Sequence, residues 1–430
     1  PLASQAESKG YLSIMSELAK ILCKVTDMNA ISYQSNSGAT GEYAGLQAIR
    51  DYHASRGQSH RDLVLIPASA HGTNPASAKK LGLTIEVINT NEKGEIDLND
   101  FNKKVEMHRN RLFGLMITYP STHGVFEEST REIIETVHSF GGQVYIDGAN
   151  MNAEMGLSSP GFIGGDVCHL NLHKTFSIPH GGGGPGMGPI LIKKHLIPSL
   201  PAHHSTDVHA FDSSGKQITS ESGISVTAGP HASASILIIP YVYAKGVGVA
   251  GLKDCSEQAI LSANYLSTKL SEHYPILFAN SQGRNAHEFI IDMRKIKKET
   301  GVSEEDVAKR LMDYGFHAPT MSFPVAGTLM IEPTESENLE GLDRFAEALI
   351  SIRREIKEVE DQLQIIDGDF ADPRHNLIFA AIGELSRRGE VIDARTVGTE
   401  LRLMGRWNAV GVQYLSEVID EVIDGLGRNP

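Results

Sequence analysis

The first 190 or so residues alternate short apolar runs with segments of helical periodicity, and this alternation limits the fold more than any other feature. Residues 11–25 place apolar side chains at helical spacing, and residues 41–56 repeat the pattern. Strands are expected at 31–34, 63–66, 85–88, 112–119, 143–147 and 167–172. Because apolar strands joined by helices form sheets that are covered on both faces, the pattern predicts an α/β fold with a mainly parallel sheet.

Polar residues follow several of these strands, namely His71, Ser121, Asp147 and Lys174. The carboxyl ends of parallel strands meet at one edge of a sheet, and folds of this class bind their ligands there. We therefore expect these four side chains to line a single pocket.

Lys174 and Asp147 indicate the chemistry of that pocket. Lys174 closes the strand-like run HLNLHK at 169–174 and is followed by glycines 181–184, so we expect a partly desolvated amine that can attack an aldehyde. Asp147 ends the preceding apolar strand. An amine for covalent attachment and an anion for the pyridinium nitrogen are what pyridoxal 5′-phosphate (PLP) requires. PLP is therefore the cofactor we predict.

Seven segments, in order along the chain, carry a resemblance to a known family. Three of them are QSNSGATGEYAG at 34–45, SAHGTNPASA at 69–78 and HLNLHKTFSIPHGGGGPGMG at 169–188. The others lie at 117–125, 147–152, 315–321 and 324–335. Through these segments, residues from about 9 to 360 resemble the C-terminal half of the glycine cleavage system P-protein family.

The resemblance implies a fold and an activity. The fold is aspartate-aminotransferase-like, with a large PLP-binding domain at 1–250 and a smaller α+β domain at 251–360. The activity is that of a glycine dehydrogenase (aminomethyl-transferring), which decarboxylates glycine with PLP and transfers the aminomethyl group to the lipoyl arm of H-protein. The family has a second, related half. We therefore expect lipoylated H-protein and that other half or subunit as partners, in a homo- or hetero-oligomer.

The resemblance also implies roles for the catalytic residues. Lys174 is expected to form the Schiff base with PLP, His71 to stack its imidazole on the pyridine ring, and Asp147 to keep the pyridine nitrogen protonated. A protonated nitrogen makes the ring an electron sink for the electrons left when carbon dioxide departs.

Further residues are expected to bind the cofactor. Ser37, Gly38 and Ala39 precede a predicted helix, whose N-terminal N–H groups and dipole suit a phosphate. Ser37 is equally suited to be an ordinary helix N-cap. Contacts are also expected from Ser121, from Ala149, whose small side chain leaves room for the ring, and from His173. If the strand continues to that point, His173 lies on the side opposite Lys174 and reaches the phosphate or the substrate carboxylate. No metal site is expected.

Two alternatives stay open. The same cofactor residues suit another PLP lyase or an aldolase of this fold, because the ring accepts electrons in all of these reactions. Residues 74–77, 151–152 and 317–320 lie outside the cofactor set and favour the P-protein. A non-catalytic interaction protein is the second alternative.

Residues from about 365 to 430 have a different character. They resemble part of the N-terminal helical domain of bacterial replicative DNA helicase, through 369–382, 384–393 and 401–415. Residues 358–430 contain seven arginines and no lysine, whereas 1–357 contain 20 lysines and 12 arginines, so a boundary is expected near 360. No G-x-x-x-x-G-K-[ST] phosphate loop occurs in the sequence, so no helicase activity is expected.

In the helicase family this domain serves in assembly and in docking partners. The segment is expected to pack as helices around seven apolar positions, Leu377, Ile378, Ile382, Leu385, Leu401, Tyr414 and Leu415.

Composition limits the possible partners and cellular compartments of the chain. A net charge of −14 argues against nonspecific binding to nucleic acid. Three scattered cysteines without C-x-x-C pairing indicate free thiols in a reducing compartment, the cytoplasm, or the mitochondrial matrix if the source is eukaryotic. No apolar run is expected to approach the roughly 18 residues of a membrane span, so no membrane partner is expected.

Overall fold

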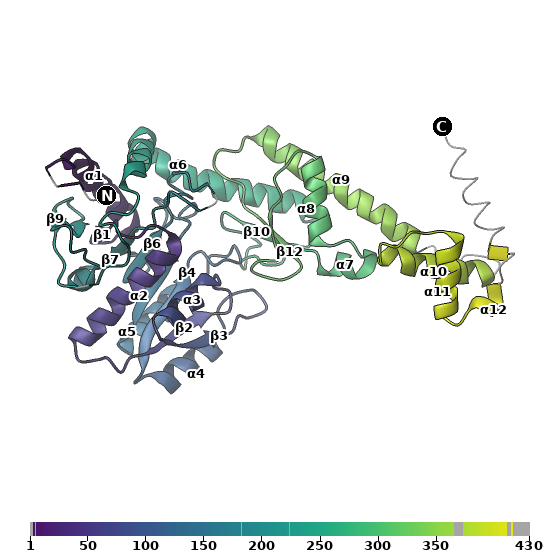
Figure 1. Ribbon diagram of the computed structural model, residues 1–430, viewed down its shortest axis with the longest axis horizontal. Helices are drawn as coiled ribbons and strands as arrows, with labels where there is room; N and C mark the ends of the chain where they lie inside the picture. The colour runs from purple at the N-terminus through teal and green to yellow at the C-terminus, as the bar shows by residue number, and fades with distance from the viewer. Residues whose placement is uncertain are drawn as a thin grey trace. The chain divides into compact units, whose positions relative to one another are not determined.

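The computed structural model describes residues 3, 4, 6–181, 183–222, 224–364, 373–410, 414 and 415 (Figure 1). The chain groups into two compact units. The first unit comprises 1–291 and 322–343, and the second comprises 292–321 and 344–430. The division into 1–250, 251–360 and 365–430 stays a prediction.

A nine-stranded mixed sheet forms the centre of the first unit. Its strands are β1 (Ala30–Ser32), β2 (Leu63–Pro67), β3 (Thr84–Ile88), β4 (Leu112–Thr118), β5 (Gln143–Gly148), β6 (Val167–Leu170), β7 (Ile190–Ile192), β8 (Ala210–Asp212) and β9 (Gln217–Ile218). Their order is β3-β2-β4-β5-β6-β7-β1-β8-β9. Every pairing from β3 to β6 is parallel, and the pairings from β6 to β9 are antiparallel. The prediction of a mainly parallel sheet is confirmed for the part that carries the predicted site.

Helices cover both faces of this sheet (Figure 1). They are α1 (Lys9–Thr26), α2 (Gly38–Ser55), α3 (Thr73–Lys80), α4 (Leu98–His108), α5 (Thr130–Ser139) and the short 3-10 helix η1 (Lys194–Ser199). Val144 and Ile146 of β5 pack into one buried cluster with α1, α4 and α5. Tyr145, between them, packs into a second cluster with α2 and α3. This alternation shows why β5 is buried at every position, since neither of its faces meets water.

The rest of the first unit follows the sheet in sequence. It contains η2 (Ala234–Leu237), the long helix α6 (Ile238–Leu270), most of β10 (Phe289–Asp292), β12 (Thr328–Ile331) and the start of α9 (Leu339–Gln364). In the described part of the chain, the stretch 234–270 alone is long and apolar enough to span a bilayer by length and composition. This contradicts the expectation that no apolar run of such length occurs, although one such helix is by itself a weak indication of a membrane span. Gly248 interrupts the helix with φ 72° and ψ 178°.

The second unit contains α7 (Arg294–Thr300), α8 (Glu304–Asp313), β11 (Thr320–Met321), the remainder of α9 and the helices α10 (Pro373–Arg387), α11 (Ala394–Leu403) and α12 (Trp407–Val410). Ser303 begins α8 with the reciprocal hydrogen bonds of a capping box, and Asp393 does the same for α11. Both helices therefore start where the sequence supplies a side-chain acceptor for the free N–H groups of the first turn.

The three C-terminal helices share a small core of their own. Its buried members are Ile378, Ala381, Leu385, Val397, Leu401, Val410 and Leu415, with Leu377, Ile382, Trp407 and Tyr414 partly buried beside them. All seven apolar positions predicted for the core of this segment are among these residues. The prediction of a helical segment is confirmed for 373–410, 414 and 415, whereas 365–372, 411–413 and 416–430 lie outside the described residues.

Candidate functional site

Parallel pairing brings the predicted strand-end residues to one edge of the sheet. Thr118 of β4 lies opposite Asp147 of β5, and Asp147 lies opposite His169 of β6. Ser121 follows β4 by three residues, and Lys174 follows β6 by four. The strand ends that precede Ser121 and Lys174 therefore lie beside Asp147 at one edge of the sheet, while a single pocket lined by all four residues stays a prediction.

Asp147 lies at the end of β5, where it is buried and well supplied with hydrogen-bond donors. Its Oδ2 accepts a hydrogen bond from Asn74 Nδ2 at 3.0 Å, and its Oδ1 accepts one from the Ala149 N–H at 3.0 Å. Burial is the largest influence and opposes ionisation, but the charge of His169, the two donors and the charge of Lys174 together lower the pKa of Asp147. The side chain is therefore a buried anion at neutral pH.

Lys174 lies in a turn rather than at the end of a strand. β6 ends at Leu170, and the Lys174 N–H donates to the Asn171 carbonyl at 3.0 Å within the turn that follows. The side chain is exposed, so the expectation of a partly desolvated amine is wrong for this structure. Its positive charge nevertheless acts on the buried residues around it, because it lowers the pKa values of Asp147, His169 and Glu288. The amine is thus near the carboxylate with which it was predicted to share a pocket.

His173 is half-buried beside Lys174. Its ring stacks on His180 with centroids 4.2 Å apart, and its Nδ1 is buried without a hydrogen-bond partner among the described residues. Burial, followed by the charges of His180 and Lys174, lowers the pKa of His173 to about 4. Because no strand continues to this point, the alternation expected to place His173 opposite Lys174 does not apply. At neutral pH the ring is uncharged and can donate or accept a hydrogen bond.

His71 and Ser121 lie on loops after β2 and β4. The His71 ring is exposed, with its Nδ1 2.8 Å from Thr73 Oγ1 and its edge against Phe323 at a centroid distance of 5.3 Å. Ser121 is buried, and its Oγ donates to the Val125 carbonyl at 3.3 Å. Ser121 therefore has a structural partner within its own loop.

The start of α2 lies against the turn that carries Lys174. Ser37 is the N-cap, and its Oγ accepts a hydrogen bond from the Thr40 N–H at 3.2 Å. A β-carbon at Gly38 would lie 2.5 Å from Asn171 Oδ1, so a larger residue there would have to displace the Asn171 side chain. Asn171 Oδ1 is itself buried without a hydrogen-bond partner among the described residues. The first N–H groups of α2 therefore lie close to the lysine turn, where they can bind an anion.

The glycine-rich segment packs against the start of α2 at its end. Gly183 and Gly184 have open space where a β-carbon would be. A β-carbon at Gly186 would lie 2.3 Å from the Asn36 carbonyl oxygen, and one at Gly188 would lie 2.1 Å from the Ser37 carbonyl oxygen. It is therefore the end of the glycine-rich segment that packs against the start of α2.

Glu42 is a site residue that the sequence reasoning missed. It lies on α2, is 3% exposed, and accepts hydrogen bonds from Thr73 Oγ1 at 2.6 Å and Ser77 Oγ at 2.9 Å. Burial, followed by the negative charge of Asp147, raises the pKa of Glu42 to about 7. The signal in the sequence was the placement of Glu42 inside the 34–45 segment, but a glutamate in the first turns of a helix is usually solvated.

A second missed group lies beside Lys174 and comes from distant parts of the sequence. His287, Glu288 and Glu332 bring one ligand atom each within 4.8 Å of one another. Both ring nitrogens of His287 are buried without a hydrogen-bond partner among the described residues, and Glu332 accepts from Asn150 Nδ2 at 2.5 Å. Burial, followed by the charge of Glu332, raises the pKa of Glu288 to about 8, and the charge of Lys174 opposes the rise. The positive charge of Lys174 therefore reaches Glu288 and favours its ionised form.

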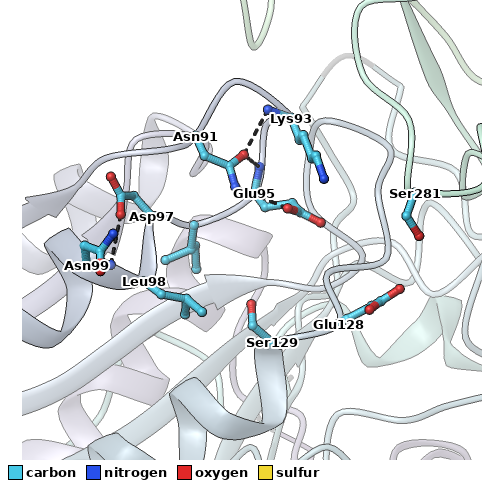
Figure 2. A pocket seen from close by; sticks show the side chains of 10 residues that line it. Asn91, Lys93, Glu95, Asp97, Leu98, Asn99, Glu128, Ser129 and Ser281 are labelled. Atoms are coloured by element: carbon cyan, nitrogen blue, oxygen red, sulfur yellow. Dashed lines mark hydrogen bonds between the residues drawn. The ribbon is translucent and has the colours of Figure 1, made fainter.

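A separate pocket of about 530 Å³ is open on the first unit. Figure 2 shows its polar lining, in which the Asn91 side chain accepts from the Lys93 and Glu95 N–H groups and Asp97 accepts from the Asn99 N–H. None of the predicted site residues lines this pocket. These polar groups are already paired in loop and helix-capping hydrogen bonds, so the pocket is not a candidate active site.

Three protein-family models match successive parts of the chain. Residues 5–206 match "Glycine cleavage system P-protein", and residues 255–370 match "Glycine dehydrogenase, C-terminal domain". Residues 346–426 match "DnaB-like helicase N terminal domain". Both resemblances stated from the sequence are confirmed.

Curated relatives agree with these matches. The chain is 56% identical over 364 residues to a glycine dehydrogenase (decarboxylating) from Deinococcus radiodurans, which covers 84% of this chain and 37% of the relative. It is 58% identical over 361 residues to glycine dehydrogenase (decarboxylating) 2 from Colwellia psychrerythraea, which covers 84% and 36%. The chain thus spans little more than a third of the length of these relatives.

Solved structures show the fold. A glycine decarboxylase (P-protein) in inhibitor-bound form aligns with a TM-score of 0.61 and 18% identity, over 80% of this chain and 76% of that one. A glutamate decarboxylase from Lactobacillus brevis aligns with a TM-score of 0.63 and 13% identity, over 83% and 82%. A cysteine desulfurase from Thermococcus onnurineus aligns with a TM-score of 0.61 and 18% identity, over 81% and 86%. The predicted fold class, that of the aspartate-aminotransferase-like enzymes, is confirmed.

Proposed function

This chain belongs over most of its length to the glycine cleavage system P-protein family, and on that basis we propose that it decarboxylates glycine with PLP and passes the aminomethyl group to lipoylated H-protein. The observation that carries the proposal is the buried anion Asp147, held at the same sheet edge as Lys174 and the start of α2. An amine, a carboxylate and a helix start are the three groups that the aldehyde, the pyridine nitrogen and the phosphate of PLP require.

The local structure fits this cofactor. The N–H groups at the start of α2 lie beside the turn that carries Lys174, where they could bind a phosphate. His173 Nδ1 and Asn171 Oδ1 are buried polar atoms that lack hydrogen-bond partners among the described residues, as expected for atoms beside a polar ligand. When bound, PLP supplies an electron sink for the electrons left when carbon dioxide departs.

The chain's own residues then have distinct tasks. Asp147 holds a proton on the pyridine nitrogen, because its pKa is lowered and Asn74 fixes its orientation. Lys174 supplies the amine that binds the cofactor aldehyde. Ser37, Gly38 and Ala39 bind the phosphate through their N–H groups and the dipole of α2. His71 would supply a ring for one face of the pyridine, and the small side chain of Ala149 would leave room for the cofactor on the other face.

The partners follow from the family and from the span of the chain. Since the chain covers 37% of the length of a curated relative, we propose that the other P-protein half contributes to the complete site. Cys23, Cys168 and Cys255 are free thiols, which supports a reducing compartment such as the cytoplasm. The helicase-like segment is proposed to dock other proteins rather than nucleic acid. Residues 365–430 contain seven arginines and eleven acidic residues, so their net charge is negative and does not favour binding to phosphates.

Carboxyl exchange tests this function. Purified protein with PLP, and with the other P-protein half, should incorporate labelled bicarbonate into glycine only when lipoylated H-protein is present. Cleavage of a β-hydroxy amino acid without H-protein, and no exchange, would indicate the aldolase alternative. Absence of any cofactor absorbance would indicate the non-catalytic interaction protein.

A further inference from the structure

Glu42, itself buried, belongs to a hydrogen-bond network that connects two predicted site residues, of which His71 is exposed and Asp147 is buried. Its Oε1 is 2.6 Å from Thr73 Oγ1, and Thr73 Oγ1 is 2.8 Å from Nδ1 of His71. On its other side, the Asn74 amide donates to both Glu42 and Asp147, with Asn74 Nδ2 3.0 Å from Asp147 Oδ2. Glu42 therefore contacts neither ring face nor pyridine nitrogen, but touches the residues that position both.

The single proton of the Thr73 hydroxyl makes this network directional. When Glu42 is ionised, it can only accept, so the Thr73 hydroxyl donates to Glu42 and can only accept from His71. His71 must then carry its proton on Nδ1. When Glu42 is protonated, it can donate to Thr73 Oγ1, the hydroxyl turns toward His71, and Nδ1 becomes an acceptor. The Thr73 N–H, 3.2 Å from Nδ1, supports that second arrangement.

We propose that Glu42 is a positioning residue which selects the tautomer of His71 through the hydroxyl of Thr73. This inference rests on the proposed function, in which the His71 ring lies on the face of the cofactor. Glu42 acts only through Thr73, so it orients the ring and sets which nitrogen donates, and it takes no part in the bonds that are made or broken.

The charges around Glu42 suit a group that changes state near neutral pH. Asp147 and Tyr145 of β5 are the ionisable groups whose charge interacts with it directly. His169 of β6 is hydrogen bonded to the Tyr145 hydroxyl and lies 3.7 Å from Asp147. Burial and the charge of Asp147 place the pKa of Glu42 at about 7, so rising pH ionises it and moves the His71 proton to Nδ1.

Three variants separate this role from a merely structural one. Gln at position 42 can accept from Ser77 and Asn74 through its oxygen and donate to Thr73 through its nitrogen, so Glu42→Gln should imitate the protonated acid at every pH. Thr73→Val removes the hydroxyl while keeping the shape of the side chain. Thr73→Ser keeps the hydroxyl and should restore the wild-type behaviour.

Nitrogen-15 spectra of the histidine-labelled, cofactor-free full chain provide the primary test, with the His71 signals assigned by their absence in His71→Asn. In the wild type and in Thr73→Ser, Nδ1 of the neutral ring should change from acceptor to donor as the pH rises through 7, with the charged ring, which donates from both nitrogens, counted separately in the same spectra. Glu42→Gln should keep Nδ1 as an acceptor throughout, and Thr73→Val should lose the pH dependence. A wild-type tautomer that does not change with pH, or a Glu42→Gln variant that changes like the wild type, would overturn the proposal.

Cofactor affinity provides a second measurement, which distinguishes a failure of the Glu42 proposal from a failure of the proposed PLP-dependent function. The PLP dissociation constant, from visible absorbance at pH 8, should rise by about two- to tenfold in Glu42→Gln and Thr73→Val, as for loss of one hydrogen bond, and Thr73→Ser should match the wild type. Equal affinities in all four proteins would contradict a positioning role. If the wild-type chain binds no PLP, the proposed function fails, while the nitrogen-15 spectra still decide the role of Glu42.

Discussion

Asp147 Oδ1 lies 3.7 Å from Nδ1 of His169, its neighbour across β5 and β6. Burial is the main influence on His169 and lowers its pKa, even though Asp147 opposes the shift. Burial thus disfavours the charged imidazole, while the hydrogen bonds from Asn74 and Ala149 and the charge of Lys174 also help to keep Asp147 ionised. Asp147 is left as an anion that can pair with a protonated pyridine nitrogen.

Replacing Lys174 tests the covalent attachment. Lys174→Ala should lose the cofactor that borohydride reduction fixes to the protein, because the exposed amine in the turn after β6 is gone. Mass spectrometry of peptides from the reduced protein makes the measurement. Lys216→Ala, at another exposed lysine, is the control and should retain the label. Label on a different lysine in the wild-type protein would end the assignment.

Replacing Asp147 tests the electron sink. Asp147→Asn should keep the fold and lower the rate of glycine–bicarbonate exchange by about 100-fold or more, because a neutral amide does not hold the pyridine proton. Asp254→Asn, at an exposed aspartate, is the control and should exchange at the wild-type rate. Near-normal exchange by Asp147→Asn with all partners present would show that another group holds this proton.

The lowered pKa of Asp147 also sets an acid limit on stability. A carboxylate whose pKa is lower in the folded state contributes stability above its unfolded pKa of about 3.9, and this contribution is lost as the pH falls further. The difference in melting temperature between the wild type and Asp147→Asn should therefore shrink between pH 5 and pH 3. A difference that stays constant over this interval would contradict the lowered pKa.

The raised pKa of Glu127 predicts a dependence of stability on pH opposite to that of Asp147. It is buried and accepts from the Ile96 N–H at 3.1 Å, and burial raises its pKa to about 7. A raised folded pKa means that stability is complete below the unfolded value and falls as the pH rises toward 7. Glu127→Gln should consequently raise the melting temperature at pH 8 relative to the wild type, with less gain at pH 5. Glu128→Gln, at the exposed neighbouring residue, should change neither.

Deleting residues 365–430 tests the independence of the C-terminal segment. Its helices have a core of their own, so the truncated chain should bind PLP with unchanged affinity and melt at nearly the same temperature. Leu401→Ala, which should cost about 2–5 kcal/mol in that core, is a milder disturbance and should also spare PLP binding. Loss of PLP binding on deletion would show that the segment is part of the enzyme fold.

Much of the site could be predicted because its residues follow apolar strands that can be recognised in the sequence. Asp147 and Lys174 stand after apolar runs, and parallel pairing requires their ends to meet. The exposure of Lys174 could not be predicted, since it depends on β6 ending at Leu170. Strand periodicity gives no information about where a turn begins.

Other site residues could not be found from the sequence for a different reason. Glu42 is buried only because Thr73 and Ser77, from the next helix, supply its donors. His287 and Glu332 meet across 45 positions of the sequence, and nothing local to either of them indicates a partner. Tertiary contacts that satisfy a buried polar group leave no periodic trace.

The contact between Gly38 and Asn171 has a mechanical consequence. The start of α2 contacts the lysine turn through the Asn171 side chain, and Gly188 packs its backbone against the Ser37 carbonyl oxygen. The segments proposed to hold the two ends of the cofactor are therefore in direct contact with each other. Because close-packed contacts transmit displacements, a larger residue at position 188 would have to move the start of α2 and so change the distance between the amine and the phosphate site.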